Sequence, residues 1–231
     1  MSRDLIIACD FSSGEETLRF LDRFKQRKPF VKIGMELYYA QGPQIVRELK
    51  SRGHKIFLDL KLHDIPNTVE KAMRVLSGLD VDMVNLHASG AHAMMEAALK
   101  GLTRPDGSRP LLVAVTQLTS TTEQIMREEL WIGHPLTDVV LHYAFNAKQA
   151  GLDGVVCSPH EAAQVHAHCG NGFITVTPGI RFAHSIQDDQ RRVTTPAMAR
   201  EMGSDFIVVG RPITAAGDPA EAYRRCLDDF I

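Results

Sequence analysis

Eight short runs of apolar and β-branched residues are spread along the chain, and the segments between them repeat apolar residues at helical spacing. The strands that these runs predict are Leu5–Phe11, Phe30–Met35, Lys55–Lys61, Val81–Ala88, Leu111–Leu118, Gly154–Ser158, Phe173–Thr177 and Phe206–Gly210. Strands that alternate with helices are parallel, because each helix returns the chain to the end where the previous strand began. The sequence therefore predicts an α/β fold, and the (β/α)8 TIM barrel is the closed form that such units favour.

The segments between the predicted strands carry helix signals. Val69, Met73 and Leu76 lie on one helical face, and Asp218-Pro219 has the N-cap and first-turn chemistry that begins a helix. An open, doubly wound sheet is the structural alternative, but the DFSSGEE sequence after the first strand lacks the glycine-rich turn typical of that fold. No linker or low-complexity tract divides the chain, so we expect residues 1–231 to form one barrel domain.

Composition excludes several classes of protein. The 231 residues are 44% hydrophobic and 23% charged, as in ordinary folded domains. The 26 Lys and Arg residues are balanced by 28 Asp and Glu, so the chain lacks the basic surplus of nucleic-acid-binding surfaces. Its four cysteines form neither a disulfide framework nor a CxxC pair, and no apolar run has the roughly 20 residues of a membrane helix. We expect a cytoplasmic protein that binds neither nucleic acid nor membrane.

Charged residues lie where the predicted strands end, which in a barrel is the edge that holds the active site. Asp10 ends the first strand, Lys32 lies in the second, and the third ends with Asp59 and Lys61, followed by Asp64. Side chains alternate along a strand, so Lys32, Asp59 and Lys61 point into the barrel mouth while their apolar neighbours face the helices. A structural ion-pair network and a catalytic array both explain the pattern, and its repetition at three strand ends favours the catalytic array.

Lys61 lies between two acids in the sequence, Asp59 and Asp64. Opposite charges on both sides favour its ammonium form and oppose the effect of burial. A protonated lysine is poorly suited to form a Schiff base, which needs a free amine, but it can deliver a proton to a carbanion. We therefore interpret Lys61 as a general acid.

Glycine and arginine follow the seventh and eighth predicted strands. These loops read Thr177-Pro178-Gly179-Ile180-Arg181 and Val209-Gly210-Arg211-Pro212-Ile213-Thr214. Glycine lets backbone N–H groups approach an anion, and a guanidinium binds two phosphate oxygens at once. Either loop alone is commonly a turn with a surface charge, but barrels often bind phosphate with these two loops together. The pattern favours a phosphorylated small molecule as the substrate.

Other reactive side chains carry weaker signals. His160, His166, His168 and Cys169 lie close together in the sequence, but His166 and His168 are about 200° apart around a helix. That separation favours a polar helix end over a metal site, so we expect no metal there. His87 either lines the barrel mouth or bonds a neighbouring backbone group.

Two segments do not fit the alternation of strands and helices. Ser120 and Glu123 have the spacing of a capping box, which indicates one additional helix. Residues 180–195 are polar and lack a period, and we interpret them as a candidate lid.

Seven motifs occur in the order that is typical of one enzyme family. They are IIACDFSS, VKIGMEL, FLDLKLHDIPNTV, VTQLTS, TPGIR, DDQRRV and VVGRPIT. They run from end to end of the chain, and the third, with its Asp-x-Lys-x-x-Asp pattern, is the most specific. On these motifs the chain resembles the bacterial type of the orotidine 5′-phosphate decarboxylase family. The short pattern alone also marks relatives such as 3-keto-gulonate 6-phosphate decarboxylase.

The resemblance implies decarboxylation of orotidine 5′-monophosphate to uridine 5′-monophosphate, the last step of de novo pyrimidine synthesis, with no metal or organic cofactor. Lys61 would donate a proton to C6 of a vinyl carbanion, and Lys32, Asp59 and Asp64 would complete the catalytic array. The family forms homodimers with shared active sites. The resemblance also implies the residues that contact the substrate. Asp10 and Lys32 would bind the ribose, Asp59 would lie near the departing carboxylate, and Thr119 would bind the pyrimidine edge. The phosphate end would contact Arg181, Gln190, Gly210 and Arg211, and the partner subunit's substrate would contact Asp64, Ile65 and Thr68.

Two other functions remain open on the sequence. A sugar-phosphate enzyme of the same barrel type, either a metal-dependent β-keto acid decarboxylase or an epimerase, would stabilise an enediolate and usually recruit a divalent ion. A catalytically silent sensor of phosphorylated metabolites would use the charged array only to close the barrel. Turnover of orotidine 5′-monophosphate in excess chelator distinguishes the three.

Overall fold

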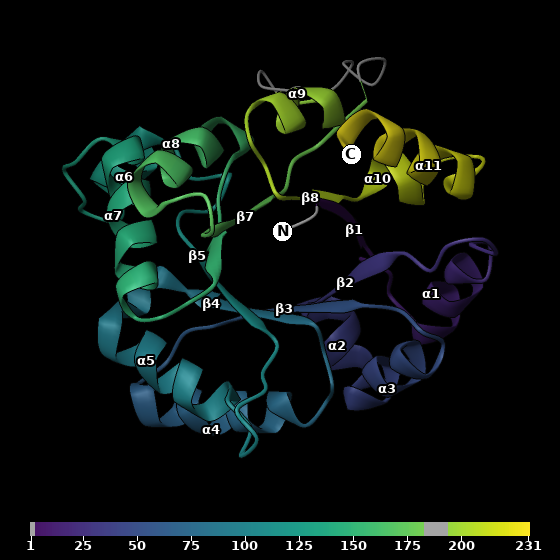
Figure 1. Ribbon diagram of the computed structural model, residues 1–231, viewed down its shortest axis with the longest axis horizontal. Helices are drawn as coiled ribbons and strands as arrows, with labels where there is room; N and C mark the ends of the chain where they lie inside the picture. Colours follow the sequence, from purple (N-terminus) through teal and green to yellow (C-terminus); the bar gives the residue numbers. More distant parts are fainter. Residues whose placement is uncertain (1–2, 183–193) are drawn as a thin grey trace.

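The computed structural model describes residues 3–182 and 194–231. In this part of the chain eight parallel strands close into a barrel in sequence order, and helices surround it (Figure 1). The strands are β1 (Asp4–Ala8), β2 (Phe30–Gly34), β3 (Ile56–Leu62), β4 (Met83–His87), β5 (Leu111–Val115), β6 (Gly154–Val156), β7 (Ile174–Thr177) and β8 (Phe206–Val209). Each overlaps a predicted strand, so the predicted (β/α)8 barrel is confirmed.

Helices form the outer layer of the barrel (Figure 1). They are α1 (Gly14–Leu21), α2 (Met35–Gln41), α3 (Pro43–Ser51), α4 (Pro66–Ser77), α5 (Ala91–Leu102), α6 (Glu123–Glu128), α7 (Leu136–Gln149), α8 (Pro159–Cys169), α9 (Pro196–Glu201), α10 (Arg211–Thr214) and α11 (Pro219–Phe230), with a 3-10 turn, η1, at Ala88–Gly90. The predicted start of the last helix is confirmed, because the Asp218 carboxylate accepts hydrogen bonds from the N–H groups of Ala220 and Glu221. None of the described helices is both long and apolar enough to cross a membrane.

Two apolar cores result from the alternation of side chains along each strand. The inner core fills the barrel with residues such as Phe57, Met83 and Val208, and the outer core packs the opposite strand faces against the helices. Because both faces are covered, the strands read as nearly continuous apolar runs. Phe57 is 2% exposed, and truncating such a core aromatic to alanine typically costs about 3–5 kcal/mol.

Several strands end before the predicted boundary. The fifth predicted strand runs to Leu118, whereas β5 ends at Val115. Leu118 is 46% exposed and lines a cavity at the mouth of the barrel. Leu118, the last residue of the predicted strand, therefore forms part of the wall of this cavity instead of extending β5.

The predicted additional helix is present as α6, but its predicted cap is wrong. Thr122, not Ser120, is the N-cap residue, and its side chain accepts a hydrogen bond from the Ile125 N–H at 3.2 Å. Glu123 is the first helical residue, and its carboxylate accepts a hydrogen bond from the Leu136 N–H. Both Ser120 and Thr122 are suitable cap residues, so spacing alone does not choose between them.

Helices α4 and α5 pack closely side by side (Figure 1). Gly101 permits this approach, because a Cβ atom there would lie 2.1 Å from the backbone oxygen of Glu70. Any side chain at this position would push α4 outward. The packing fixes α4, whose first turn follows the segment that carries Asp64.

Candidate active site

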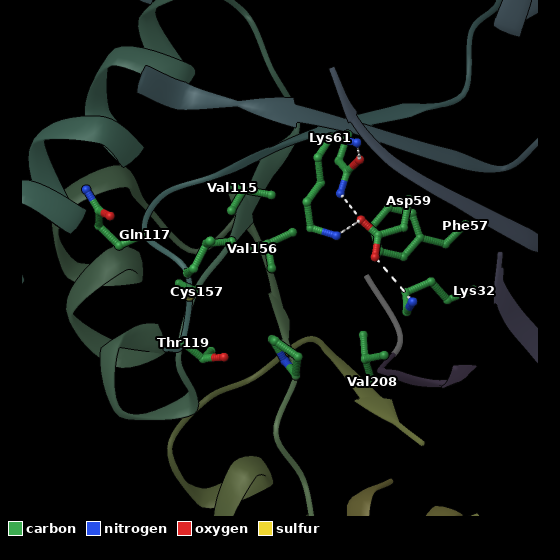
Figure 2. A pocket seen from close by; sticks show the side chains of 13 residues that line it. Lys32, Phe57, Asp59, Lys61, Val115, Gln117, Thr119, Val156, Cys157 and Val208 are labelled. Atoms are coloured by element: carbon green, nitrogen blue, oxygen red, sulfur yellow. Dashed lines mark hydrogen bonds and ion pairs between the residues drawn. The ribbon is translucent and has the colours of Figure 1, made fainter. Parts of the chain in front are cut away.

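A cavity of about 140 Å³ opens where the strands end. Its lining residues belong to β2, β3, β4, β5, β6 and β8 or directly follow β5, β6 and β7 (Figure 2). The lining residues are Lys32, Phe57, Asp59, Lys61, Asn85, Val115, Gln117, Leu118, Thr119, Val156, Cys157, Pro178 and Val208. The cavity is thus an apolar chamber with two lysines, one carboxylate and one amide along one side.

Asp59 is the centre of the charged array. Its Oδ1 atom accepts a hydrogen bond from Lys61 Nζ at 2.6 Å, and its Oδ2 atom lies 3.3 Å from Lys32 Nζ (Figure 2). Lys32 Nζ also donates to Asp10 Oδ1 at 2.9 Å. The structure therefore brings together four of the charged groups that the sequence places at the strand ends, in the order Asp10, Lys32, Asp59, Lys61.

Charge pairing keeps Asp59 and Lys32 ionised despite their burial. Asp59 is 7% exposed, and burial alone would raise the pKa of its carboxyl. The ammonium groups of Lys32 and Lys61, with the donors bonded to the carboxylate, reverse this and lower the pKa of Asp59. Burial would likewise lower the pKa of Lys32, but the carboxylates of Asp59 and Asp10 raise it.

Strand β3 is irregular at this site. Leu58 pairs with Val84 and Leu62 with Leu86, so Asp59, Leu60 and Lys61 of β3 face a single residue of β4, Asn85. Lys61 has a φ angle of 50°, in the left-handed region that side chains other than glycine rarely adopt. Such a bulge re-aims the side chains of the bulged strand, and here it sits beside the charged array.

Asn85 is a residue of this site that the sequence-based prediction missed, because the prediction was based on charged residues at strand ends and Asn85 is neutral. It is 2% exposed, its Nδ2 donates to Asp59 Oδ1 at 2.6 Å, and its Oδ1 accepts from the Lys61 N–H at 2.8 Å. The available signal is an amide within the otherwise apolar run MVNL, because a buried amide must find hydrogen-bond partners.

Asp64 lies apart from the array within one chain. Among the described residues, Lys61 forms an ion pair with Asp59 but not with Asp64. The expectation that acids lie on both sides of Lys61 is therefore correct for Asp59 and wrong for Asp64 within one chain. Asp64 is exposed beyond the end of β3, and its carboxylate accepts a hydrogen bond from the Ile65 N–H. Ile65, which is 65% exposed, and Thr68 are also exposed, at the start of α4.

The residues expected at the phosphate end follow two adjacent strands, β7 and β8. Gly179 has a φ angle of 87°, which favours glycine, and the Arg181 N–H donates to the Thr194 carbonyl. Gly210 precedes α10, and Arg211 is its exposed first residue. Gln190 lies outside the described residues, as does most of the segment that we interpret as a lid.

The remaining candidate side chains do not form a second site. His166 Nε2 lies 3.0 Å from the Gly203 carbonyl oxygen, His160 lies near Thr194, and His168 packs against Phe145. Within residues 3–182 and 194–231, no three His, Cys, Asp or Glu side chains are arranged to hold a metal. The His87 ring lies 5.7 Å from that of His63, and burial lowers its pKa.

Comparison with known proteins places the chain in a family. The family model described as "Orotidine 5'-phosphate decarboxylase / HUMPS family" matches residues 3–226. The chain belongs to this family. A member from Geobacillus sp. (strain WCH70), named orotidine 5′-phosphate decarboxylase, is 57% identical over 233 residues, covering 100% of this chain and 98% of that protein. A member with the same name from Bacillus caldolyticus is 56% identical, covering 97% and 93%.

A solved member of the family has the same barrel. The crystal structure of orotidine 5′-phosphate decarboxylase from Lactobacillus acidophilus superposes with a TM-score of 0.89 at 42% sequence identity, covering 99% of each chain. The family resemblance drawn from the motifs is therefore confirmed over nearly the whole sequence.

Proposed function

We propose that this chain decarboxylates orotidine 5′-monophosphate to uridine 5′-monophosphate and CO2, the last step of de novo pyrimidine synthesis, with Lys61 as the proton donor. Family membership over residues 3–226 supports the reaction. The observation that carries the mechanism is the 2.6 Å contact between Lys61 Nζ and the buried Asp59 carboxylate, inside the cavity at the barrel mouth.

The reaction requires a positively charged group beside one carbon atom of the substrate, C6. Breaking the bond between C6 and its carboxylate releases CO2 and leaves the electron pair on C6, as a vinyl carbanion with no adjacent electron sink. A fixed positive charge aimed at that carbon stabilises the transition state more than the substrate, which is the condition for catalysis. The Lys61 ammonium supplies that charge and then the proton that completes uridine 5′-monophosphate.

Asp59 holds the Lys61 ammonium in place before the substrate arrives. In the bound complex its carboxylate lies near the carboxylate that leaves, and repulsion between the two groups is relieved as CO2 departs. Asp59 bonds both lysines, so it also orients them. Lys32 thereby carries a charge that is fixed by two acids, Asp59 and Asp10.

The residues that line the cavity suit a ring with apolar faces and polar edges. Phe57, Val115, Val156 and Val208 form apolar walls. We assign the pyrimidine edge to Thr119, which is exposed and also lines the cavity. We assign the ribose hydroxyl groups to Asp10 and Lys32. We assign the phosphate end to Arg181, Gln190, Gly210 and Arg211. Of these, Arg181 follows β7, and Gly210 and Arg211 follow β8; these three do not line the apolar cavity.

We further propose a homodimer in which each subunit completes its partner's site. The support is the exposed position of Asp64, Ile65 and Thr68, which lie past the end of β3 and turn toward solvent rather than toward Lys61. In a two-fold dimer such a donation is reciprocal. The partner subunit's Asp64 would then supply a second acid beside Lys61.

An absorbance assay of orotidine 5′-monophosphate, in buffer with and without excess chelator, tests the proposal. We expect substrate loss at equal rates in both buffers, with uridine 5′-monophosphate and CO2 formed in equal amounts. Loss of activity in chelator would favour the metal-dependent sugar-phosphate chemistry. Binding without turnover would favour the silent sensor.

A further inference from the structure

Two adjacent strands lose their regular pairing at the charged array, and one side chain replaces the missing backbone contacts. Between the paired residues Leu58 and Leu62, strand β3 has three residues where β4 has only Asn85. The Lys61 N–H, which the bulge turns away from the ladder, donates to Asn85 Oδ1 at 2.8 Å. A backbone N–H that is buried without a partner is costly, so this contact matters to the bulge.

The second contact of the same amide is with the charged array itself. Asn85 Nδ2 donates to Asp59 Oδ1 at 2.6 Å, the same oxygen that accepts from Lys61 Nζ. The carboxylate needs a donor and the N–H needs an acceptor, so the two bonds allow only one orientation of the amide. One buried side chain, 2% exposed, thus holds the acid by its carboxylate and the lysine by its backbone.

We propose that Asn85 is a positioning residue for the decarboxylation, which holds the β3 bulge and so aims Asp59 and Lys61 at the reacting carbon. The inference rests on the proposed function for its kinetic consequence, but its structural part does not. Asn85 is neutral, so it fixes the array without changing the array's net charge. Its hydrogen bond also favours the ionised form of Asp59 and so adds to the effect of the two lysines, which lower the pKa of that carboxyl.

The first experiment measures the bulge directly, without substrate. Amide hydrogen exchange of Lys61, followed by NMR, should be slow in the wild-type protein and at least about tenfold faster in the Asn85→Leu variant, which has a similar shape but no hydrogen bonds. The matched control is Thr116→Val, which removes a buried hydroxyl that bonds the Val156 carbonyl and does not contact the array. Unchanged exchange at Lys61 in Asn85→Leu would overturn the proposal.

The second experiment measures turnover. We expect kcat of Asn85→Leu to fall about 10²-fold, the typical cost of misplacing a catalytic group by about 1 Å, with a much smaller change in the affinity for uridine 5′-monophosphate. Thr116→Val should keep wild-type kcat. Wild-type kcat in Asn85→Leu would overturn the positioning role. If even the wild-type protein shows no turnover, the proposed function fails, while Lys61 amide exchange still decides whether Asn85 holds the bulge.

The Asn85→Asp variant separates positioning from general support of the fold. The introduced carboxyl would face Asp59, whose negative charge opposes its ionisation. The ammonium groups of Lys32 and Lys61 favour its ionisation. The rings of His87, farther along β4, and His63, beyond the end of β3, are the other titratable groups nearby.

When protonated, the introduced carboxyl can donate to Asp59 as the amide does. We therefore expect kcat of this variant to be higher at acidic pH and to fall as the pH rises, relative to the wild-type profile. A profile of kcat against pH that parallels the wild type would overturn the proposal.

Discussion

Replacing Asp59 with asparagine removes the negative charge on which two lysines converge. Three donors meet at this carboxylate, Lys61 Nζ at 2.6 Å, Asn85 Nδ2 at 2.6 Å and Lys32 Nζ at 3.3 Å. The side chain of asparagine has one acceptor oxygen where aspartate has two. Its NH2 group would face the ammonium or amide donors that now bond the carboxylate, so donors would meet donors. The variant Asp59→Asn therefore removes the charge partner of Lys61 and leaves Lys32 paired with Asp10 alone.

The magnitude follows from burial. Removing one partner of a buried ion pair typically costs about 3–5 kcal/mol. The side chains of Asp59 and Lys32 are 9% and 12% exposed, whereas Lys61 is 27% exposed and Lys32 keeps Asp10 as a partner at 2.9 Å. Because Lys61 is partly exposed and Lys32 stays paired with Asp10, we expect a loss at the lower end of this range. The free energy of unfolding at pH 7 should fall by about 3 kcal/mol.

Urea unfolding followed by circular dichroism, at one protein concentration, measures this loss. With a slope of about 3 kcal/mol per molar urea for a chain of this size, the midpoint should fall by about 1 M. The control is Glu15→Gln, which breaks the exposed pair with Arg19 and should leave the midpoint unchanged within error. A midpoint for Asp59→Asn equal to that of the wild type would refute the reasoning.

The pH dependence gives an independent check. The pKa of Asp59 is lowered in the folded protein, so its contribution is fully present above the unfolded value, about 3.9, and disappears as the pH falls through the folded value. The stability difference between wild type and Asp59→Asn should therefore be constant from pH 5 to 7 and shrink below about pH 4. A difference that persists unchanged in acid would show that the charge of Asp59 is not its source.

Three further predictions concern function. Lys61→Ala should abolish decarboxylation while calorimetry still detects uridine 5′-monophosphate binding, because the lysine acts on the carbanion; substantial residual turnover would contradict this. Arg211→Ala should strongly reduce turnover of the phosphorylated substrate but hardly change the slow reaction of unphosphorylated orotidine, and equal losses would disprove its phosphate role. Mixed dimers of Lys61→Ala and Asp64→Ala should regain about a quarter of wild-type activity, since half the dimers are hybrids with one intact site. Activity at the parents' level, with exchange shown by mass spectrometry, would mean that Asp64 acts within its own subunit.

Local sequence patterns were sufficient to predict the barrel. Eight apolar runs alternating with helical segments leave few topologies, because parallel strands need crossovers and a closed sheet has no exposed edge. Strand parity likewise predicts that Lys32 and Asp59 face the barrel mouth, because side chains alternate with a period of two. These features depend on near neighbours in the sequence.

The tertiary structure alone decided the details of the site. Asn85 is 24 residues from Lys61 and 26 from Asp59, and its two hydrogen bonds exist only because β3 bulges against β4 at this point. A bulge shifts the register without altering the apolar pattern on either side, so periodicity cannot reveal it. Asp64 shows the same limit. It is only the third residue after Lys61 in the sequence, but it lies past the end of β3 in an exposed segment. Contacts between strands depend on register and on where each strand ends, and tertiary packing sets both.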